Sequence, residues 1–229
     1  MRDPSRFSAL CADARASGLA CRGAFHPRRA DGVPALADGS RVATLVLLGF
    51  TGPGQWPAFA SSAERADGRP HPLDRWSRRL IDALGLRYGA AALYPSGGPP
   101  WLPFQRWALR AEPVHVSPIG ILIHPDWGLW HAYRGALAFR ARLDLPAPER
   151  RPSPCASCRD RPCQRTCPVA AIAPAGYDHA ACTAHVASAA GGDCLALGCR
   201  ARRSCPVGAA HRYDPEQAEF HMRAFLGRG

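Results

Sequence analysis

The sequence predicts an α+β fold in two parts: a layered α/β domain over residues 1–148 and a small cysteine-rich module over residues 149–229. Stretches with helical and strand patterns alternate through the first part, which is typical of layered α/β domains. A proline-rich linker at residues 145–154 separates the two parts. Eight of the ten cysteines then fall between Cys155 and Cys205.

Each predicted element rests on a local pattern. Residues 41–50 are almost continuously apolar, which favours a central strand buried on both faces. Apolar residues at helical spacing predict a helix over 72–86. A helix over 215–226, with Asp214 as its N-cap and Pro215 at its first position, closes the chain. The other predicted elements are helices at 9–19, 56–66 and 104–111, and strands at 90–94, 119–124 and 130–143.

Composition limits the class of protein. The chain has 229 residues, of which 47% are hydrophobic, enough for a substantial core. The longest apolar run, Val42–Phe50, suits a strand and is too short to span a bilayer. The first ten residues lack the apolar core of a signal peptide. We therefore expect a cytoplasmic protein with reduced thiols and no membrane contact.

The net charge of +11 is carried entirely by arginine, because the chain contains no lysine. The arginines are spread along the chain together with abundant Ala, Pro and Gly, a composition that a GC-rich genome also produces. We therefore do not expect nucleic acid as a partner. The pairs Arg150-Arg151 and Arg202-Arg203 flank the cysteine region. A basic rim there could dock an acidic redox partner protein or RNA, and an ordinary solvated face is the alternative.

The cysteines of the second part occur in two runs, and each run ends in Cys-Pro. The runs are Cys155-x2-Cys158-x4-Cys163-x3-Cys167-Pro168 and Cys194-x4-Cys199-x5-Cys205-Pro206, with Cys182 between them. Thiolates at such spacing bind soft metals, and Cys-x3-Cys-Pro is the ending of ferredoxin-type iron–sulfur motifs. The spacing therefore indicates a metal-binding, iron–sulfur protein that transfers electrons.

The ferredoxin rule also assigns the ligands, because in two-cluster ferredoxins the cysteine before proline binds the other cluster. Eight thiolates would hold two [4Fe-4S] clusters, with the second run less regular than the first. The first set is Cys155, Cys158, Cys163 and Cys205, and the second is Cys167, Cys182, Cys194 and Cys199. The first run has four residues rather than two between its second and third cysteines, an insertion that costs little loop-closure entropy.

Zinc and disulfide bonds are the alternatives to iron–sulfur clusters for these cysteines. Structural zinc favours two separated Cys-x2-Cys knuckles, and only Cys155 and Cys158 form one. A disulfide framework requires an oxidising compartment. The two remaining cysteines, Cys11 and Cys21, have no partner at metal-binding spacing, so they are predicted to be packing or free thiols.

One segment carries a family resemblance. Residues 119–135, with Ile-His-Pro at 123–125 and Arg-Gly at 134–135, resemble the CblC-type cobalamin-processing proteins. The order of the two parts resembles epoxyqueuosine reductases and reductive dehalogenases. The resemblance implies a nitroreductase-like domain followed by a ferredoxin-like module. It also implies a base-off cobalamin reduced by the clusters, with five residues near the corrinoid: His124, Gly128, Trp130, Arg134 and Gly135.

The same residues could instead serve in ordinary packing. His124 on an apolar strand suits a core or turn position, and Arg134 could pair with Asp126. Four aromatic residues could line a wide cofactor pocket or simply pack: Tyr94, Trp101, Phe104 and Trp107. The Gly-Leu-Gly-x-x-Gly-Lys-Asn type segment of epoxyqueuosine reductases is absent, and the chain has no Lys or Asn to supply it, so tRNA-base reduction is not expected.

Three functional hypotheses follow. The chain could be an oxidoreductase, in which the clusters deliver electrons to bound cobalamin, although no catalytic residue can be assigned. It could be a cobalamin-binding or trafficking protein, or a plain ferredoxin-like electron carrier that docks a redox partner. Motifs of other chemistries are absent: the sequence has no dinucleotide fingerprint, P-loop, nucleophile elbow or zinc-protease helix.

Overall fold

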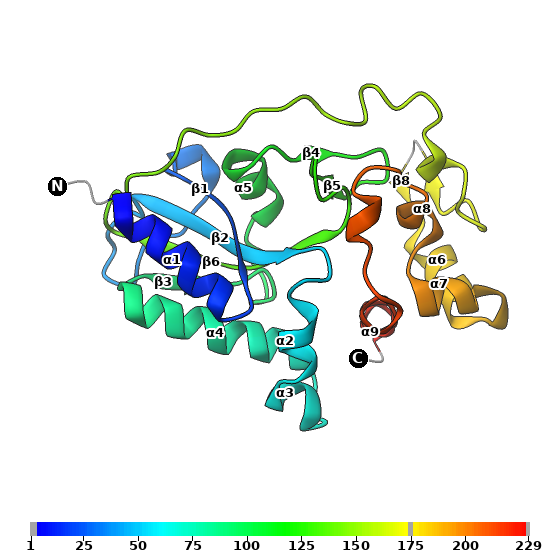
Figure 1. Cartoon of the computed structure of the whole chain (residues 1–229), viewed down its shortest axis with the longest axis horizontal. Coiled ribbons are helices and arrows are strands. Elements are labelled where there is room, and N and C mark those ends of the chain that lie inside the picture. Colours follow the sequence, from blue (N-terminus) through cyan, green and yellow to red (C-terminus); the bar gives the residue numbers. More distant parts are fainter. Residues whose placement is uncertain (1–3, 174–175, 228–229) are drawn as a thin grey trace. The chain divides into compact units, whose positions relative to one another are not determined.

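The computed structural model describes residues 4–173 and 176–227, and the chain divides into two compact units that both mix helices and strands (Figure 1). Unit 1 comprises Met1–Pro113 and Ala132–Arg150, and unit 2 comprises Val114–His131 and Arg151–Gly229. The mixed composition agrees with the α+β prediction. The division differs from the expected boundary near residue 148, because residues 114–131 belong with the cysteine-rich part.

Unit 1 contains a four-stranded sheet in the order β1-β2-β6-β3, with β1 antiparallel to β2 and β3 antiparallel to β6. The strands are β1 (Ala20–Phe25), β2 (Thr44–Thr51), β3 (Ala91–Leu93) and β6 (His131–Phe139). All residues of β2 except Thr51 are buried. The strand therefore lies inside the sheet with both faces covered, which explains its continuous apolar run.

The helices of unit 1 cover the sheet (Figure 1). They are α1 (Pro4–Ala16), α2 (Trp56–Ala60), α3 (Ala63–Ala66), α4 (Pro72–Tyr88) and α5 (Phe104–Ala111), with a 3-10 turn, η1, at Arg29–Asp31. Helix α1 packs against β1 and α4, α4 packs against β3, and α5 packs against β1 and β2. The helix predicted at 56–66 is broken in two, because Ser62 starts a new helix by accepting the Arg65 N–H.

Helix α4 begins with Pro72 at its first position and ends at Gly89, which adopts the left-handed conformation. Its buried face presents Trp76, whose ring centre lies 5.9 Å from Phe50 and 5.7 Å from Phe59. Burying such side chains contributes about 1.5–3 kcal/mol each. This aromatic group therefore anchors α4 to the sheet.

Unit 2 is built from short elements. Two hairpins, β4 (His115–Val116) with β5 (Leu122–Ile123) and β7 (Ile172–Ala173) with β8 (Gly176–Tyr177), accompany the helices. The helices are α6 (His179–Ala187), α7 (Gly192–Leu197), α8 (Arg200–Arg203) and α9 (Pro215–Phe225), with 3-10 turns η2 (Pro162–Gln164), η3 (Ala189–Gly191) and η4 (Ala209–His211). Helix α7 packs against α6 and α9. No described helix of either unit combines the length and apolarity that crossing a bilayer requires.

Candidate metal centre

Four cysteines of unit 2 line one apolar cavity. They are Cys155, Cys158, Cys163 and Cys205. Pro118, Ile123 and Val207 supply apolar walls. Cys163 and Cys205 are buried, and the other two are half-buried. This set matches the one that the ferredoxin rule assigns to the first cluster, although Cys205 is remote from the other three in the sequence.

Local packing brings Cys205 to this cavity. Cys163 lies in η2, and Cys205 follows α8, which packs against η2. The residues just before the two Cys-Pro pairs are also joined, because the Thr166 hydroxyl donates to Ser204 Oγ over 3.0 Å. The two Cys-Pro loops are therefore fixed side by side, although 38 residues separate these hydroxyls in the sequence.

The cavity changes the acidity of its thiols. Burial raises the pKa of Cys155, Cys163 and Cys205 above the usual value for a thiol. Negative charge on neighbouring thiolates adds to this effect, with Cys205 acting on both Cys155 and Cys163. The thiols of Cys155, Cys163 and Cys205 are therefore protonated at neutral pH, and a bound cation must displace their protons.

The remaining predicted ligands form a second group. Burial raises the pKa of Cys199, and charges on Cys182 and Cys167 raise it further. Burial likewise raises the pKa of Cys194, and Cys199 is among the neighbours that add to it. The Tyr177 hydroxyl contacts Cys182, and burial followed by this contact raises the pKa of Tyr177. Electrostatic interactions therefore link the four cysteines of the second predicted set.

Ion pairs hold the loop that carries two of these cysteines. Asp193, beside Cys194, accepts hydrogen bonds from Arg200 at 2.7 and 2.8 Å and from Arg203 at 2.7 Å. The Arg200 contact is the main cause that lowers the pKa of Asp193 to about 2. Asp193 thus ties α7 to α8 across the turn that contains Cys199.

The shape of the two cysteine groups bears on the metal. Among residues 4–173 and 176–227, no three or more Cys, His, Asp or Glu side chains come close enough to hold one metal ion. A tetrahedral zinc site would need its ligands drawn together at about 2.3 Å from the metal. The described residues therefore do not themselves show a metal or cluster site, and the two ligand sets stay a prediction.

Residues 114–131 pack against the second Cys-Pro loop. A Cβ atom on Gly128 would overlap the Val207 carbonyl oxygen, and one on Gly208 would overlap the Trp127 backbone. The guanidinium of Arg202 lies 4.4 Å from the Trp130 ring centre and donates to the Leu129 carbonyl. These contacts explain why the segment belongs to unit 2.

The five residues that the resemblance places near a corrinoid are divided between the units. His124, Gly128 and Trp130 belong to unit 2, and Arg134 and Gly135 belong to unit 1. His124 is buried, and its Nδ1 accepts the Asp126 N–H over 3.0 Å. Trp130 is buried between Arg202 and Tyr213.

Arg134 and Gly135 both make packing contacts within unit 1. Arg134 donates to Ser77 Oγ and to Asp74, whereas the expected partner Asp126 pairs with Arg151. Gly135 leaves no room for a side chain, since a Cβ there would meet Ile81. Each of the five residues therefore has a structural role, and their corrinoid role stays a prediction.

The aromatic residues expected to wall a cofactor pocket have separate environments. Phe104 and Trp107 are buried in unit 1 with ring centres 4.8 Å apart, and Trp107 Nε1 donates to the Asp31 carbonyl. The Tyr94 hydroxyl donates to Asp82, and Trp101 is 66% exposed. Phe104 and Trp107 are therefore core residues.

Cys11 and Cys21 form a pair that sequence spacing did not reveal. Cys11 lies on α1 and Cys21 on β1, and their side chains share a hydrogen bond. This bond, helped by Arg15, lowers the pKa of Cys11, whereas the same bond and burial raise the pKa of Cys21. Both are free thiols, as predicted. The sequence did not show that the packing of α1 on β1 brings them together.

Comparisons with known proteins support the architecture. No protein-family model and no curated protein matches this chain. A solved structure is similar to this chain over most of this chain's length. Epoxyqueuosine reductase has a similar fold. The matching structure is a crystal structure of epoxyqueuosine reductase with an epoxyqueuosine-modified tRNA-Tyr stem loop.

The TM-score is 0.52 with 14% sequence identity, and the match covers 93% of this chain and 70% of the other. At this identity the epoxyqueuosine reductase match establishes similarity of fold alone. It agrees with the architectural resemblance seen in the sequence. It does not support the resemblance to CblC-type proteins.

Proposed function

We propose that this chain is an iron–sulfur redox protein whose unit 2 binds two [4Fe-4S] clusters and that it acts as a reductase. The observation that carries the proposal is the cavity lined by Cys155, Cys158, Cys163 and Cys205. The ferredoxin rule assigns the same four residues to one cluster from spacing alone. The apolar walls would exclude water from the cluster and so tune its potential for one-electron transfer.

Metal content tests the proposal. Protein purified without oxygen should contain about eight irons and about eight acid-labile sulfides per chain. Stoichiometric zinc without sulfide would contradict the proposal, and about four irons would restrict it to the first cluster. Intramolecular disulfides among these cysteines in freshly purified protein would favour a disulfide framework instead.

Single substitutions test the ligand sets. Cys205→Ser should damage the first cluster, and Cys199→Ser should damage the second, so each should lower the iron content by about half. Cys11→Ser is the matched control, because Cys11 lies in unit 1 outside both sets. Unchanged absorbance and electron paramagnetic resonance spectra in Cys205→Ser would reject the cross-ligation.

A corrinoid is the proposed electron acceptor. One observation supports it: the resemblance of residues 119–135 to cobalamin-processing proteins. Cobalamin added to the anaerobic protein should give a base-on to base-off spectral change, weakened in Arg134→Ala but not in the surface control Arg142→Ala. Tens of micromolar cobalamin corresponds to a binding free energy of roughly 6 kcal/mol. If no spectral change occurs at this concentration, the corrinoid function is rejected and the electron-carrier function takes its place.

RNA is a second candidate partner. The similar structure contains a tRNA stem loop, and this chain carries a net charge of +11. Both observations count against the expectation that nucleic acid is no partner. Fluorescence anisotropy with a tRNA stem loop should show binding that weakens steeply with salt. Absence of binding at low salt would exclude RNA as a partner.

A further inference from the structure

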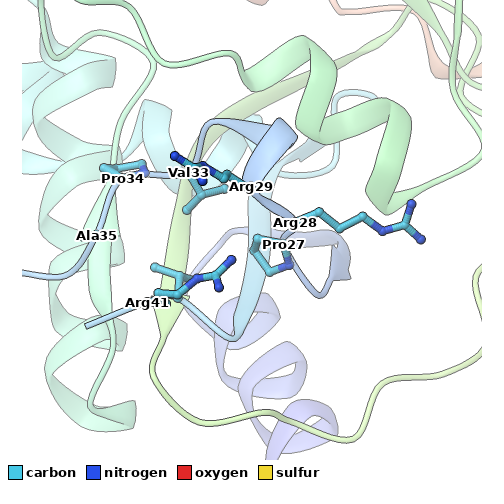
Figure 2. A pocket seen from close by; sticks show the side chains of 8 residues that line it. Pro27, Arg28, Arg29, Val33, Pro34, Ala35 and Arg41 are labelled. Atoms are coloured by element: carbon cyan, nitrogen blue, oxygen red, sulfur yellow. The ribbon is translucent and has the colours of Figure 1, made fainter. Parts of the chain in front are cut away.

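A cavity in unit 1 is separate from both cysteine groups and from the five corrinoid candidates. It has a volume of about 360 Å³. Its walls are Pro27, Arg28, Arg29, Val33, Pro34, Ala35, Arg41 and Val42 (Figure 2). The volume is within the range of small-molecule sites. The cavity thus combines three cationic side chains with several apolar ones, and none of these lining residues is acidic.

The three arginines of the cavity differ from several others of unit 1. Arg22, Arg110 and Arg134, among others in this unit, form ion pairs with carboxylates. Within the described part of the chain, by contrast, Arg28, Arg29 and Arg41 have no carboxylate partner. Their positive charges are therefore available to an anion from solution.

The acids nearest to these arginines in the sequence cannot neutralise them, because both are already engaged. Asp38, the one nearest to Arg41, pairs with Arg140. The Asp31 carboxylate accepts from the Arg28 backbone N–H over 2.6 Å, and from Arg110 Nη1 at 2.7 and 2.8 Å. The Asp31 carbonyl accepts from the buried Trp107 indole over 2.8 Å. These bonds fasten the turn that carries Arg28 and Arg29 to helix α5.

The opposite wall is also fixed. Arg41 and Val42 lead into β2, and Ala43 next to them donates its N–H to the Phe139 carbonyl over 2.8 Å. The Ala43 carbonyl is bonded to His26 Nδ1 at 2.9 Å. Figure 2 shows Arg41 directed toward the turn that carries Arg29, while Arg28 extends outward. Arg29 and Arg41 thus project from two ordered segments around one cavity.

We propose that this cavity binds a phosphorylated small molecule, with Arg29 and Arg41 as the phosphate ligands. Guanidinium groups match phosphate oxygens in geometry and keep their charge at any physiological pH. The prolines and valines would contact the apolar part of the ligand. The volume of about 360 Å³ favours a small molecule over an extended nucleic acid backbone. The proposal does not depend on the clusters or on a corrinoid.

Calorimetric titration of the iron-loaded protein with inorganic pyrophosphate, at constant ionic strength, tests the site. We expect a Kd below about 1 mM. Arg29→Gln and Arg41→Gln should each weaken binding at least about tenfold, which corresponds to about 1.4 kcal/mol, because each removes a charged hydrogen-bond donor. Arg142→Gln is the matched control, because Arg142 is an exposed arginine of unit 1 outside the cavity.

Three outcomes would overturn the proposal. One is no heat at millimolar pyrophosphate, and another is an equal loss of affinity in Arg142→Gln, which would indicate nonspecific attraction. The third is a single-stranded RNA that binds through Arg29 and Arg41 and is not displaced by pyrophosphate. Thermal unfolding and cluster absorbance of each variant should match the wild type, which separates loss of binding from loss of folding.

Discussion

Gly128 shows how one residue can determine the packing of unit 2. Its φ is +58°, and a side chain there would overlap the Val207 carbonyl oxygen in the loop after Cys205. Gly120 also has a positive φ of +80°, but a Cβ there would meet nothing within 4 Å. Comparing substitutions at the two glycines therefore separates the free-energy cost of backbone strain from the free-energy cost of steric overlap.

We predict that Gly128→Ala destabilises unit 2 more than Gly120→Ala does. The control should cost about 1–2 kcal/mol for the left-handed backbone alone. Gly128→Ala should add about 1–3 kcal/mol for overpacking and should lower the iron content. Denaturant unfolding and iron analysis of both variants measure this. Equal destabilisation would mean that the two loops are not in close contact.

A second residue-scale prediction concerns Cys11. The hydrogen bond from Cys21 and the charge of Arg15 lower the pKa of Cys11, although burial opposes them. Cys11 should therefore be alkylated by iodoacetamide at lower pH than an ordinary thiol. Cys21→Ala removes the donor and should shift the pH–rate profile of Cys11 upward, as mass spectrometry can follow. An unchanged profile would show that Cys21 does not stabilise the thiolate.

At the scale of elements, a buried ion pair joins three parts of unit 1. Arg22 of β1 donates to Glu112, just after α5, and to the Phe50 carbonyl of β2. Tyr133 of β6 also donates to Glu112. Arg22 is 1% exposed, so its charge depends on these partners. Burial raises the pKa of Glu112, and the positive charge of Arg22 is the largest of the effects that lower it.

We predict that Glu112→Ala lowers the free energy of unfolding by about 3–5 kcal/mol, because it leaves the Arg22 charge buried without its partner. The double variant Arg22→Met with Glu112→Leu should recover most of this loss. Arg140→Ala, which removes an exposed ion pair with Asp38, should cost about 0–1 kcal/mol. Urea unfolding provides the values. A loss in Glu112→Ala no larger than this control would contradict the prediction.

Elements with a strong repeating pattern could be predicted from the sequence. Helix α5 has the predicted bounds, 104–111, and α4 extends the predicted 72–86 only slightly. The strand expected at 119–124 shrinks to Leu122–Ile123, because Gly120 forms a turn with Ser117. Strand β1 was not predicted: Gly23 interrupts its pattern, and a side chain at Gly23 would overlap the Ala111 carbonyl. Such contacts depend on tertiary packing.

The candidate site, like the fold, could be predicted from the sequence only in part. The ferredoxin spacing rule was enough to group Cys205 with Cys155, which line the same cavity, whereas their binding of a cluster stays a prediction. The pairing of Cys11 with Cys21 and the gathering of Arg29 and Arg41 were not visible. In both cases the partners meet only through the packing of elements, which leaves no regular interval in the sequence.

At the scale of the whole molecule, cluster loading should depend on pH. Burial raises the pKa of Cys155, Cys163 and Cys205, so iron must displace protons from them. Reconstitution with iron and sulfide should therefore become more complete between about pH 6.5 and 8.5. Absorbance measures the yield. A yield that is constant or falls with pH would contradict this.

The metal-free protein should show the opposite trend. A raised thiol pKa in the folded state means that folding favours the protonated form. The resulting contribution to stability is complete below the unfolded pKa and is lost as the pH rises through the folded pKa. The apoprotein should thus be less stable at alkaline pH, while loading improves. Thermal unfolding of the apoprotein at pH values above about 8.5, the ordinary thiol pKa, measures this second trend.

Unit 2 is built from two separate stretches of the sequence, and this restricts how it could be transferred between proteins. Unit 2 takes residues 114–131 before the chain returns to unit 1, and Gly128 of that excursion meets the loop after Cys205. A gene fragment that begins at residue 149 would encode the eight cysteines of unit 2 without residues 114–131, which pack against the loop after Cys205. Recombination could move the cysteine-rich unit into another protein only by carrying both stretches, so it behaves as an insertion with two joins and not as a terminal cassette.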